Sequence, residues 1–231
     1  MGQCAVTIPK TAVVTGASSG IGAAASRRLL CDGWRVVGLS RSEPEVRHDQ
    51  FTWTPVDLAD LEGLENRLSE LDEVDAVVHA AGFQRSAPLG ALKVDDGLDM
   101  WRVHVAAAEV IVNALSDRTR DGGRIVLVGS RTMAGSAGKS QYAATKSALI
   151  GMARSWAMEL VERAITVNVV APGPTDTPML TDPSRQHTPP KSPPMGFVDP
   201  DEVAGLIAFL VGPHGRSITG QAIVQCGGAS L

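Results

Sequence analysis

Cysteine is scarce in this chain of 231 residues, and its placement excludes two classes of site. Cys4, Cys31 and Cys226 lie far apart and form no CxxC pair, so the sequence indicates neither a disulfide framework nor a zinc site. The five histidines are scattered as well and show no spacing typical of metal ligands. We therefore expect no bound metal.

Long apolar runs are also absent. No stretch reaches the roughly 18 residues that a membrane-spanning helix needs, and the first ten residues show no signal-peptide pattern. Positive charge is not in excess, with 21 Lys and Arg against 25 Asp and Glu, which argues against a nucleic-acid partner. These absences predict a cytoplasmic protein that binds neither membranes nor nucleic acid.

The residues that are present indicate an α/β fold. Hydrophobic residues make up 44% of the chain and charged residues 20%, as is usual for a globular protein with a sizeable core. Short apolar segments alternate with segments of helical spacing, and no linker or repeat divides residues 1–231. We predict a single domain with a Rossmann-type, doubly wound parallel sheet of about seven strands and helices on both faces. The expected strands cover 11–14, 35–39, 51–56, 75–79, 124–128, 165–170 and 222–224; the expected helices are a segment ending near residue 30, then 58–71, 100–115, 140–161 and 201–211.

A glycine-rich turn joins the first expected strand to the first expected helix. Residues 15–22 read Thr-Gly-Ala-Ser-Ser-Gly-Ile-Gly, and the glycines let the backbone approach a ligand closely. The helix that follows offers unpaired N–H groups and a partial positive charge to a phosphate. The part around Ser18 also matches the GxSxG nucleophile elbow of hydrolases. Only one strand precedes it, however, so the oxyanion loop of that fold has no source.

The end of the second expected strand favours NADP(H) over NAD(H). In dinucleotide-binding folds an acidic residue there binds the ribose 2′-hydroxyl, whereas a nearby arginine accommodates a 2′-phosphate. Here the acid is missing, and Ser40 and Arg41 follow the strand. A guanidinium binds a phosphate through several N–H groups. The alternative is a solvated surface arginine without a ligand.

Tyr142 is the only tyrosine in the chain, and Lys146 follows it by four residues in a segment of helical spacing. Residues four apart lie on one helix face, so both side chains can reach one site, with Ser130 meeting them from a strand end. The ordinary pKa of tyrosine, about 10, is too high for proton transfer near neutrality. A lysine ammonium about 4 Å away is worth roughly 4 kcal/mol at an effective dielectric constant near 20, enough to bring that pKa close to 7. This arrangement is typical of general acid–base catalysis at a carbonyl.

In the order of these motifs the chain resembles the short-chain dehydrogenases/reductases, in particular the compact bacterial type with one domain. The resemblance covers nearly the whole chain. The family's TGxxxGxG corresponds to residues 15–22, its YxxxK to Tyr142 and Lys146, and its upstream serine to Ser130. Its Pro-Gly turn with a following threonine corresponds to residues 172–177, and its aspartate after the third strand to Asp57.

The resemblance implies hydride transfer between NADP(H) and a small-molecule carbonyl or secondary alcohol. Ser130 would hydrogen-bond the substrate oxygen, and Tyr142 would transfer the proton. Lys146 would hold the nicotinamide ribose and lower the pKa of the tyrosine. The implied cofactor-binding residues are Gly16, Ser18, Ser19, Gly20, Ile21, Gly22, Ser40, Arg41, Asp57, Leu58, Ala80, Ala81, Gly82, Tyr142, Lys146, Pro172, Gly173, Thr175 and Thr177.

Several positions depart from the family pattern. The family's Asn-Asn-Ala-Gly appears as His-Ala-Ala-Gly at residues 79–82, and Cys226 replaces the aspartate before the closing Gly-Gly. The family's fourth catalytic residue, an asparagine that supports a proton-relaying water, corresponds to His104. The ordinary pKa of histidine is near 6.5, so we count His104 as a catalytic candidate that holds this water or relays the proton; a satisfied packing residue is the other interpretation. These departures leave a non-catalytic dinucleotide-binding protein as the alternative function.

A proline-rich segment is expected to lie over the site. Residues 181–200 contain six prolines and little periodicity, and we predict a substrate loop at 179–199. The substrate pocket is expected to include Phe83, Gln84, Arg131, Met133 and Pro174, a mixed set that does not identify the substrate. The resemblance also suggests a homo-oligomer, either a tetramer or a dimer.

Overall fold

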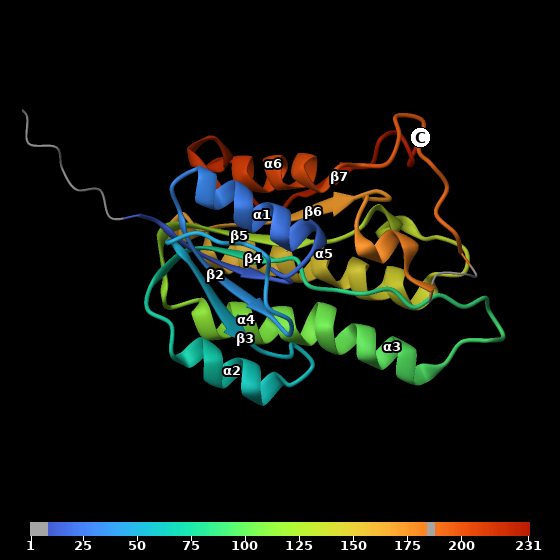
Figure 1. Cartoon of the computed structure of the whole chain (residues 1–231), viewed down its shortest axis with the longest axis horizontal. Helices are drawn as coiled ribbons and strands as arrows, with labels where there is room; N and C mark the ends of the chain where they lie inside the picture. Colours follow the sequence, from blue (N-terminus) through green and yellow to red (C-terminus); the bar gives the residue numbers. More distant parts are fainter. Residues whose placement is uncertain (1–8, 184–187) are drawn as a thin grey trace, which may run out of the picture.

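The computed structural model describes residues 9–183 and 188–231, and its centre is a seven-stranded sheet in which every pair of neighbouring strands is parallel (Figure 1). The strand order is β3-β2-β1-β4-β5-β6-β7. The predicted fold class is therefore confirmed. The strands are β1 (Thr11–Thr15), β2 (Arg35–Ser40), β3 (Phe51–Pro55), β4 (Val74–His79), β5 (Thr119–Val128), β6 (Thr166–Pro172) and β7 (Ala222–Gln225).

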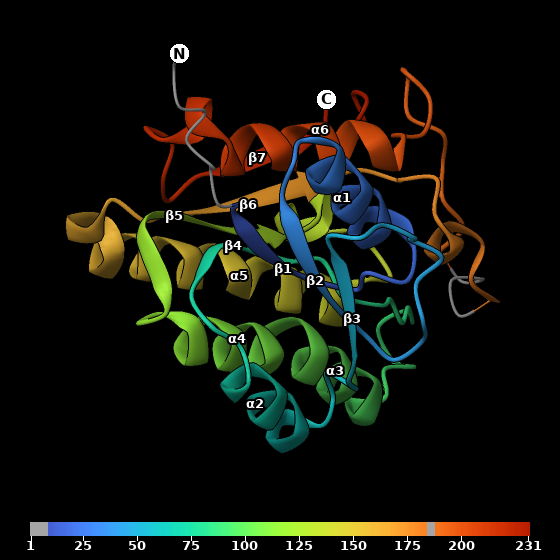
Figure 2. The same cartoon turned by 60° about the vertical axis from the view of Figure 1, so that its left-hand side comes forward.

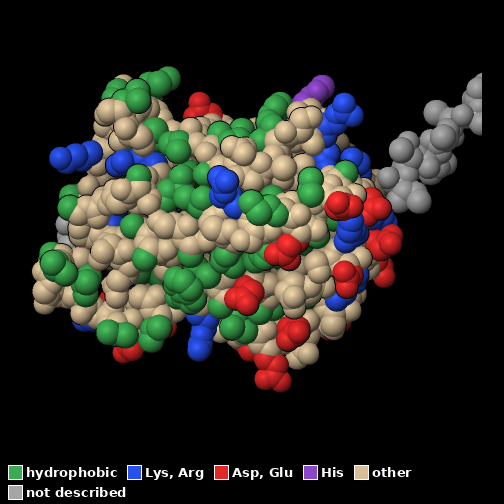
Figure 3. Space-filling model, turned by 180° about the vertical axis from the view of Figure 1, so that it is seen from behind, with side chains coloured by type: hydrophobic (Ala, Val, Ile, Leu, Met, Phe, Trp, Pro, Cys, Tyr) green, Lys and Arg blue, Asp and Glu red, His purple; other side chains and the backbone are tan. Residues whose placement is uncertain are grey.

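Helices cover both faces of this sheet (Figure 1, Figure 2). One face carries α1 and α6, and the other carries α2, α4 and the long α5. On the face seen in Figure 3, basic side chains are scattered among acidic ones, in keeping with the net charge of −4. The helices are α1 (Gly20–Cys31), α2 (Leu61–Ser69), α3 (Val94–Trp101), α4 (Ala107–Leu115), α5 (Ser140–Leu160) and α6 (Pro200–Val211).

Successive strand residues enter opposite cores, which explains why the strands read as continuous apolar runs. Val13 and Val77 belong to the core under α2, α4 and α5, whereas Val14 and Val78 belong to the core under α1 and α6. All four side chains are fully buried. A parallel sheet with both faces covered needs apolar residues at every position, not at every second one.

The strand order reverses between β1 and β4, and this reversal positions the site. From β1 the chain builds outward through β2 and β3, and from β4 it builds the other way through β5, β6 and β7. Loops at the carboxyl ends of β1 and β4 therefore diverge and leave a crevice, the usual place for a ligand in such sheets. The hydroxyl of Thr15 joins the two strand ends, because its Oγ1 accepts hydrogen bonds from the Ala80 and Ala81 N–H groups, each at 3.1 Å.

Two elements differ from their predicted bounds. The helix expected at 100–115 begins six residues earlier, at Val94, and is interrupted by a π-helical turn, Arg102–Ala106. Gly97 obscures the start, yet it is needed there because a Cβ would lie 2.6 Å from Nε2 of Gln141, which donates to the Lys93 carbonyl. Strand β5 begins at Thr119, five residues before the predicted start, because a polar Arg-Asp-Gly-Gly run hides its first half.

The other predicted elements agree with the structure to within one to three residues at each end. Helix α2 starts at Leu61 instead of residue 58, because Asp60 caps it by accepting from the Gly63 N–H. Within the described residues no helix is long and apolar enough to cross a membrane. The same residues contain no group of three or more His, Cys, Asp or Glu side chains arranged for a metal ion.

Candidate active site

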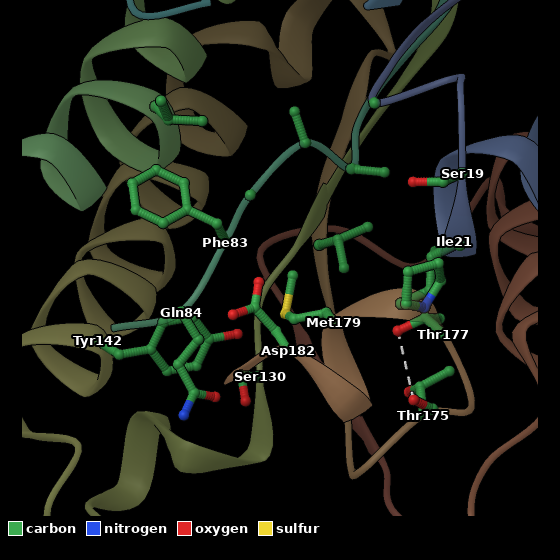
Figure 4. Close-up of a pocket in the computed structure, with 18 of the residues that line it drawn as sticks. Ser19, Ile21, Phe83, Gln84, Ser130, Tyr142, Thr175, Thr177, Met179 and Asp182 are labelled. Atoms are coloured by element: carbon green, nitrogen blue, oxygen red, sulfur yellow. Dashed lines mark hydrogen bonds between the residues drawn. The ribbon is translucent and has the colours of Figure 1, made fainter. Parts of the chain in front are cut away.

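A cavity of about 720 Å³ opens at the carboxyl ends of the strands, and Figure 4 shows part of its lining. The structure brings nearly all the predicted site residues together there. Of the predicted catalytic and cofactor-binding residues, only Gly22 and His104 do not line the cavity. The predicted residues in the lining are Gly16, Ser18, Ser19, Gly20, Ile21, Ser40, Arg41, Asp57, Leu58, Ala80, Ala81, Gly82, Ser130, Tyr142, Lys146, Pro172, Gly173, Thr175 and Thr177.

The glycine turn has the shape that only glycine permits. Gly16 has φ +68°, and a Cβ there would lie 2.9 Å from the Cα of Ala81. A Cβ on Gly22 would lie 2.3 Å from the carbonyl oxygen of Gly16, so Gly22 lets α1 pack against the turn without reaching the cavity. The turn is thereby held closed, with the N-terminus of α1 facing the crevice.

The N-terminus of α1 is suited to an anion. Its first turn carries no acidic residue, and the N-cap Ser19 makes no capping hydrogen bond with its side chain. Ser18, Ser19, Gly20 and Ile21 line the cavity at this point. Unpaired N–H groups and the positive end of the helix dipole thus face the crevice, as the phosphates of a dinucleotide require.

Arg41 lies at the mouth of the same cavity and is exposed to solvent. Among the described residues the ion pair in this loop joins Arg47 to Glu43 at 3.3 Å, and Arg41 forms none. The neighbouring Ser40 is buried, with its Oγ donating to the Ser42 carbonyl. An arginine in this position can accept a phosphate without breaking an existing ion pair, so the donor set fits NADP(H).

At the opposite end of the cavity, Ser130 has its oxygen engaged as an acceptor. The Thr132 N–H and the Thr132 hydroxyl donate to Ser130 Oγ at 3.2 and 2.9 Å. With both lone pairs of the oxygen in use, the Ser130 hydrogen is left to donate. Thr132 was not predicted as a site residue. The sequence feature that could have indicated it is a threonine two residues after Ser130, a spacing typical of a local Ser/Thr turn.

Tyr142 and Lys146 lie on the first two turns of α5, and both line the cavity. Figure 4 shows Tyr142 there, near Ser130 and Gln84. Tyr142 is 7% exposed and Lys146 4%. Lys146 Nζ donates to the Val128 carbonyl at 2.8 Å and lies 5.9 Å from the centre of the Tyr142 ring. Burial lowers the pKa of Lys146 from 10.5 to about 7. The predicted same-face arrangement of these two side chains is therefore present.

His104 lies behind the cavity wall, on the π-helical turn, and is fully buried. Its two ring nitrogens contact the Phe83 N–H at 3.1 Å and the Thr145 hydroxyl at 2.9 Å. Its ring also meets that of Tyr142 edge-on, with 5.6 Å between ring centres. Burial, followed by the nearby charge of Lys146, lowers the pKa of His104 well below 6.5.

The substrate end of the cavity includes residues from three loops. Gln84 is 4% exposed and lies beside Tyr142 and Ser130, while Met179 and Asp182 approach from the opposite loop (Figure 4). Phe83, Arg131 and Pro174 line the cavity, whereas Met133, predicted with them, does not. Ser18 also lines it, but the lining formed by described residues contains no histidine, so the Ser-His pair of the nucleophile-elbow hydrolases is not assembled there.

A doubly wound sheet, a phosphate-binding helix end and an adjoining Ser/Tyr/Lys set define a dinucleotide-dependent oxidoreductase. Comparison with known proteins identifies its family. Residues 16–230 match a family model described as enoyl-(acyl carrier protein) reductase. The 3-oxoacyl-[acyl-carrier-protein] reductase FabG of Salmonella typhimurium is 34% identical, covering 95% of this chain and 96% of the relative. The chain belongs to the short-chain dehydrogenase/reductase family.

Solved structures agree with this placement. A blue fluorescent protein from a metagenomic library, in complex with NADPH, superposes with a TM-score of 0.82 at 33% identity, covering 96% of this chain and 98% of that one. A short-chain dehydrogenase from Burkholderia cenocepacia, in complex with NADP, gives a TM-score of 0.83 at 34% identity with the same coverage.

Proposed function

We propose that the protein reduces a ketone carbonyl to a secondary alcohol, and catalyses the reverse oxidation, with Tyr142 as the general acid and base. The protein is an NADP(H)-dependent oxidoreductase. The observation that carries the proposed chemistry is that Ser130, Tyr142 and Lys146 line the same cavity as the phosphate-binding turn. No observation favours the non-catalytic alternative.

Different segments of the chain would hold different parts of the cofactor. The N-terminus of α1 would hold the pyrophosphate, Arg41 the 2′-phosphate, and Asp57 the adenosine end. Thr177 would contact the nicotinamide end; a Cβ on Gly20 would lie 3.1 Å from its side chain, so the two segments close around the crevice. When bound, the cofactor supplies the hydride.

The proton comes from the chain. The Ser130 hydroxyl would donate its free hydrogen to the substrate carbonyl oxygen. This hydrogen bond would polarise the carbonyl. Tyr142 donates its phenolic proton to that oxygen in reduction and removes it in oxidation. The Lys146 ammonium favours the phenolate that remains, because an opposite charge nearby stabilises the ionised form. Burial of both side chains strengthens this effect by excluding water.

Tyr142→Phe tests the proposal directly. The variant keeps the ring and its packing but loses the proton, so turnover should fall by at least about 100-fold. NADPH oxidation would be followed at 340 nm over a panel of 3-oxoacyl thioesters, cyclic ketones and aryl ketones. The thioesters come first because of the reaction named for the FabG relatives. An NADPH fluorescence titration would confirm that the variant still binds the cofactor; full turnover by it contradicts the proposed role.

We further propose a substrate loop and an oligomer. Met179 and Asp182 of the segment 179–199 line the cavity, which supports a loop over the substrate, although residues 184–187 lie outside the described residues. Val94 and Leu98 on α3 are 73% and 60% exposed, which supports a homo-oligomer, tetramer or dimer. We propose the cytoplasm as its location. Light scattering coupled to size-exclusion chromatography would measure the assembly.

A further inference from the structure

Two buried histidines lie behind the wall of the active site, and the chemistry proposed above uses neither. His79 ends β4 and His104 lies on the π-helical turn, and both are 0% exposed. Their hydrogen bonds determine which ring nitrogen carries the proton in each. The position of the proton on the His104 ring determines whether this side chain can transfer a proton or only holds neighbouring segments in place.

The partners of His104 require the neutral ring with its proton on Nδ1. A backbone N–H can only donate, so the Phe83 N–H makes Nε2 an acceptor without a hydrogen. The remaining proton is on Nδ1 and is directed at Thr145 Oγ1, 2.9 Å away. Thr145 in turn donates to the Tyr142 carbonyl at 2.9 Å. The loop at Phe83 is thereby connected to the first turn of α5, which carries the catalytic tyrosine.

His79 has the opposite tautomer. Thr15 Oγ1 already accepts from the N–H groups of Ala80 and Ala81, so its own hydrogen must be donated to His79 Nδ1 at 3.0 Å. The proton of His79 is therefore on Nε2. This nitrogen is buried, has no hydrogen-bond partner of normal geometry among the described residues, and faces the backbone of Val103 and His104. His79 thus supports the π-helical turn from the side of β1 and β4.

We propose that His104 is a positioning residue that holds Phe83 and the turn bearing Tyr142 in register, and that it does not relay the catalytic proton. A relay would require His104 Nε2 to take up a proton, yet this nitrogen already accepts the hydrogen bond from the Phe83 N–H. Protonation of Nε2 would leave that N–H group buried without an acceptor. Burial and the positive charge of Lys146 both oppose a charged ring. The consequence for turnover rests on the proposed function; the tautomer does not.

The tautomer can be measured on the unmodified enzyme. Two-bond nitrogen–proton NMR correlations of uniformly ¹⁵N-labelled protein distinguish the two neutral forms and the cation, with His104→Gln used to identify the signals. We expect a neutral ring with the proton on Nδ1 between pH 6 and 8. A cationic ring, or one with the proton on Nε2, overturns the proposal whether or not the ketone chemistry is correct.

Two replacements of similar volume separate positioning from relay. In His104→Gln the side-chain oxygen can still accept from Phe83, whereas His104→Leu has no acceptor. We expect kcat of the Gln variant to stay within about tenfold of wild type with an unchanged pH profile, and kcat of the Leu variant to be at least about tenfold lower than that of Gln. If both variants lose turnover equally, and the pH profile loses a limb, a relay is indicated and positioning is rejected.

Thr145→Val removes the connection to Tyr142 without changing the shape of the side chain. Turnover should fall about 10- to 100-fold, while the Kd for NADPH changes little, because misplacing a reacting group acts mainly on the chemical step. Thr166→Val is the matched control, since its buried hydroxyl has no partner among the described residues and lies on β6 away from the cavity. Equal turnover in the two variants contradicts the proposed connection.

Discussion

The buried histidines should make this protein sensitive to mild acid. Burial, followed by the charge of Lys146, lowers the pKa of His79 from 6.5 to about 3. The unfolded chain therefore binds a proton in a pH range where the native protein does not. Above pH 6.5 His79 is neutral in both states, and the free energy of unfolding is not reduced. As the pH falls from 6.5 towards 3, the unfolded chain binds a proton at His79 and the free energy of unfolding decreases. Between pH 7 and pH 5 the loss from His79 alone is about 2 kcal/mol.

This loss is a large part of the 5–15 kcal/mol by which domains are usually stable. The pKa of His104 is shifted in the same direction, so its contribution adds to the loss. Unfolding in urea, followed by the fluorescence of the four tryptophans at a fixed protein concentration, measures the difference between pH 7 and pH 5. His79→Asn should shrink this difference by about 2 kcal/mol, whatever its own effect on stability at pH 7.

The exposed His214 provides the matched control. His214→Asn should leave the difference between the two pH values as it is in the wild type. Equal free energies of unfolding at pH 7 and pH 5 in the wild type would refute the reasoning. So would a His79→Asn variant that loses as much stability on acidification as the wild type does.

Three further predictions concern the proposed cofactor end of the cavity and Lys146. Arg41→Ala should weaken NADPH binding about 10- to 100-fold and hardly affect NADH, since one charge-assisted contact is lost; an equal effect on both cofactors would remove Arg41 from the phosphate site. Gly16→Ala should lower both stability and NADPH affinity, because its Cβ meets Ala81, whereas Gly33→Ala, at φ +82° but with no atom within 4 Å, should cost only about 1 kcal/mol of stability; calorimetry and titration separate the two. Lys146→Met should abolish turnover yet raise the free energy of unfolding at pH 7 by about 1 to 3 kcal/mol. A lysine whose pKa is lowered to about 7 disfavours folding at any pH at which the unfolded chain keeps that lysine charged. A less stable variant would contradict this.

The parts of the site that follow from local patterns were predictable from the sequence. Tyr142 and Lys146 share a helix face because of their spacing, and the glycine turn follows a strand by its composition. The surroundings of His104 were not predictable, since its partners Phe83 and Thr145 are 21 and 41 residues away in the chain. Only the packing of β4, the π-helical turn and α5 brings them together, and no residue type indicates that arrangement.

The early start of the helix at Val94 was missed for a related reason. Two aspartates in the first turn favour a helix start, but Lys93 at the N-cap makes no capping hydrogen bond with its side chain and Gly97 lowers the helical propensity, which together weaken the usual signal. What holds the segment is the neighbouring Gln141, which belongs to another helix. Likewise, the role of Thr132 depends on the turn after Ser130, which the apolar run before it does not specify.

The reversal of strand order between β1 and β4 also affects how such an enzyme can diversify. Residues from segments 16–21, 40–41 and 57–58, on one side of the reversal, line the part of the cavity proposed for most of the dinucleotide, whereas residues from 130–132 and 174–182, on the other, line the part proposed for the nicotinamide end and the ketone. The two groups of loops follow different strands, so the sequence of one group can change while that of the other stays the same. A lineage of such proteins can therefore acquire new substrates by altering late loops while inheriting the coenzyme half intact.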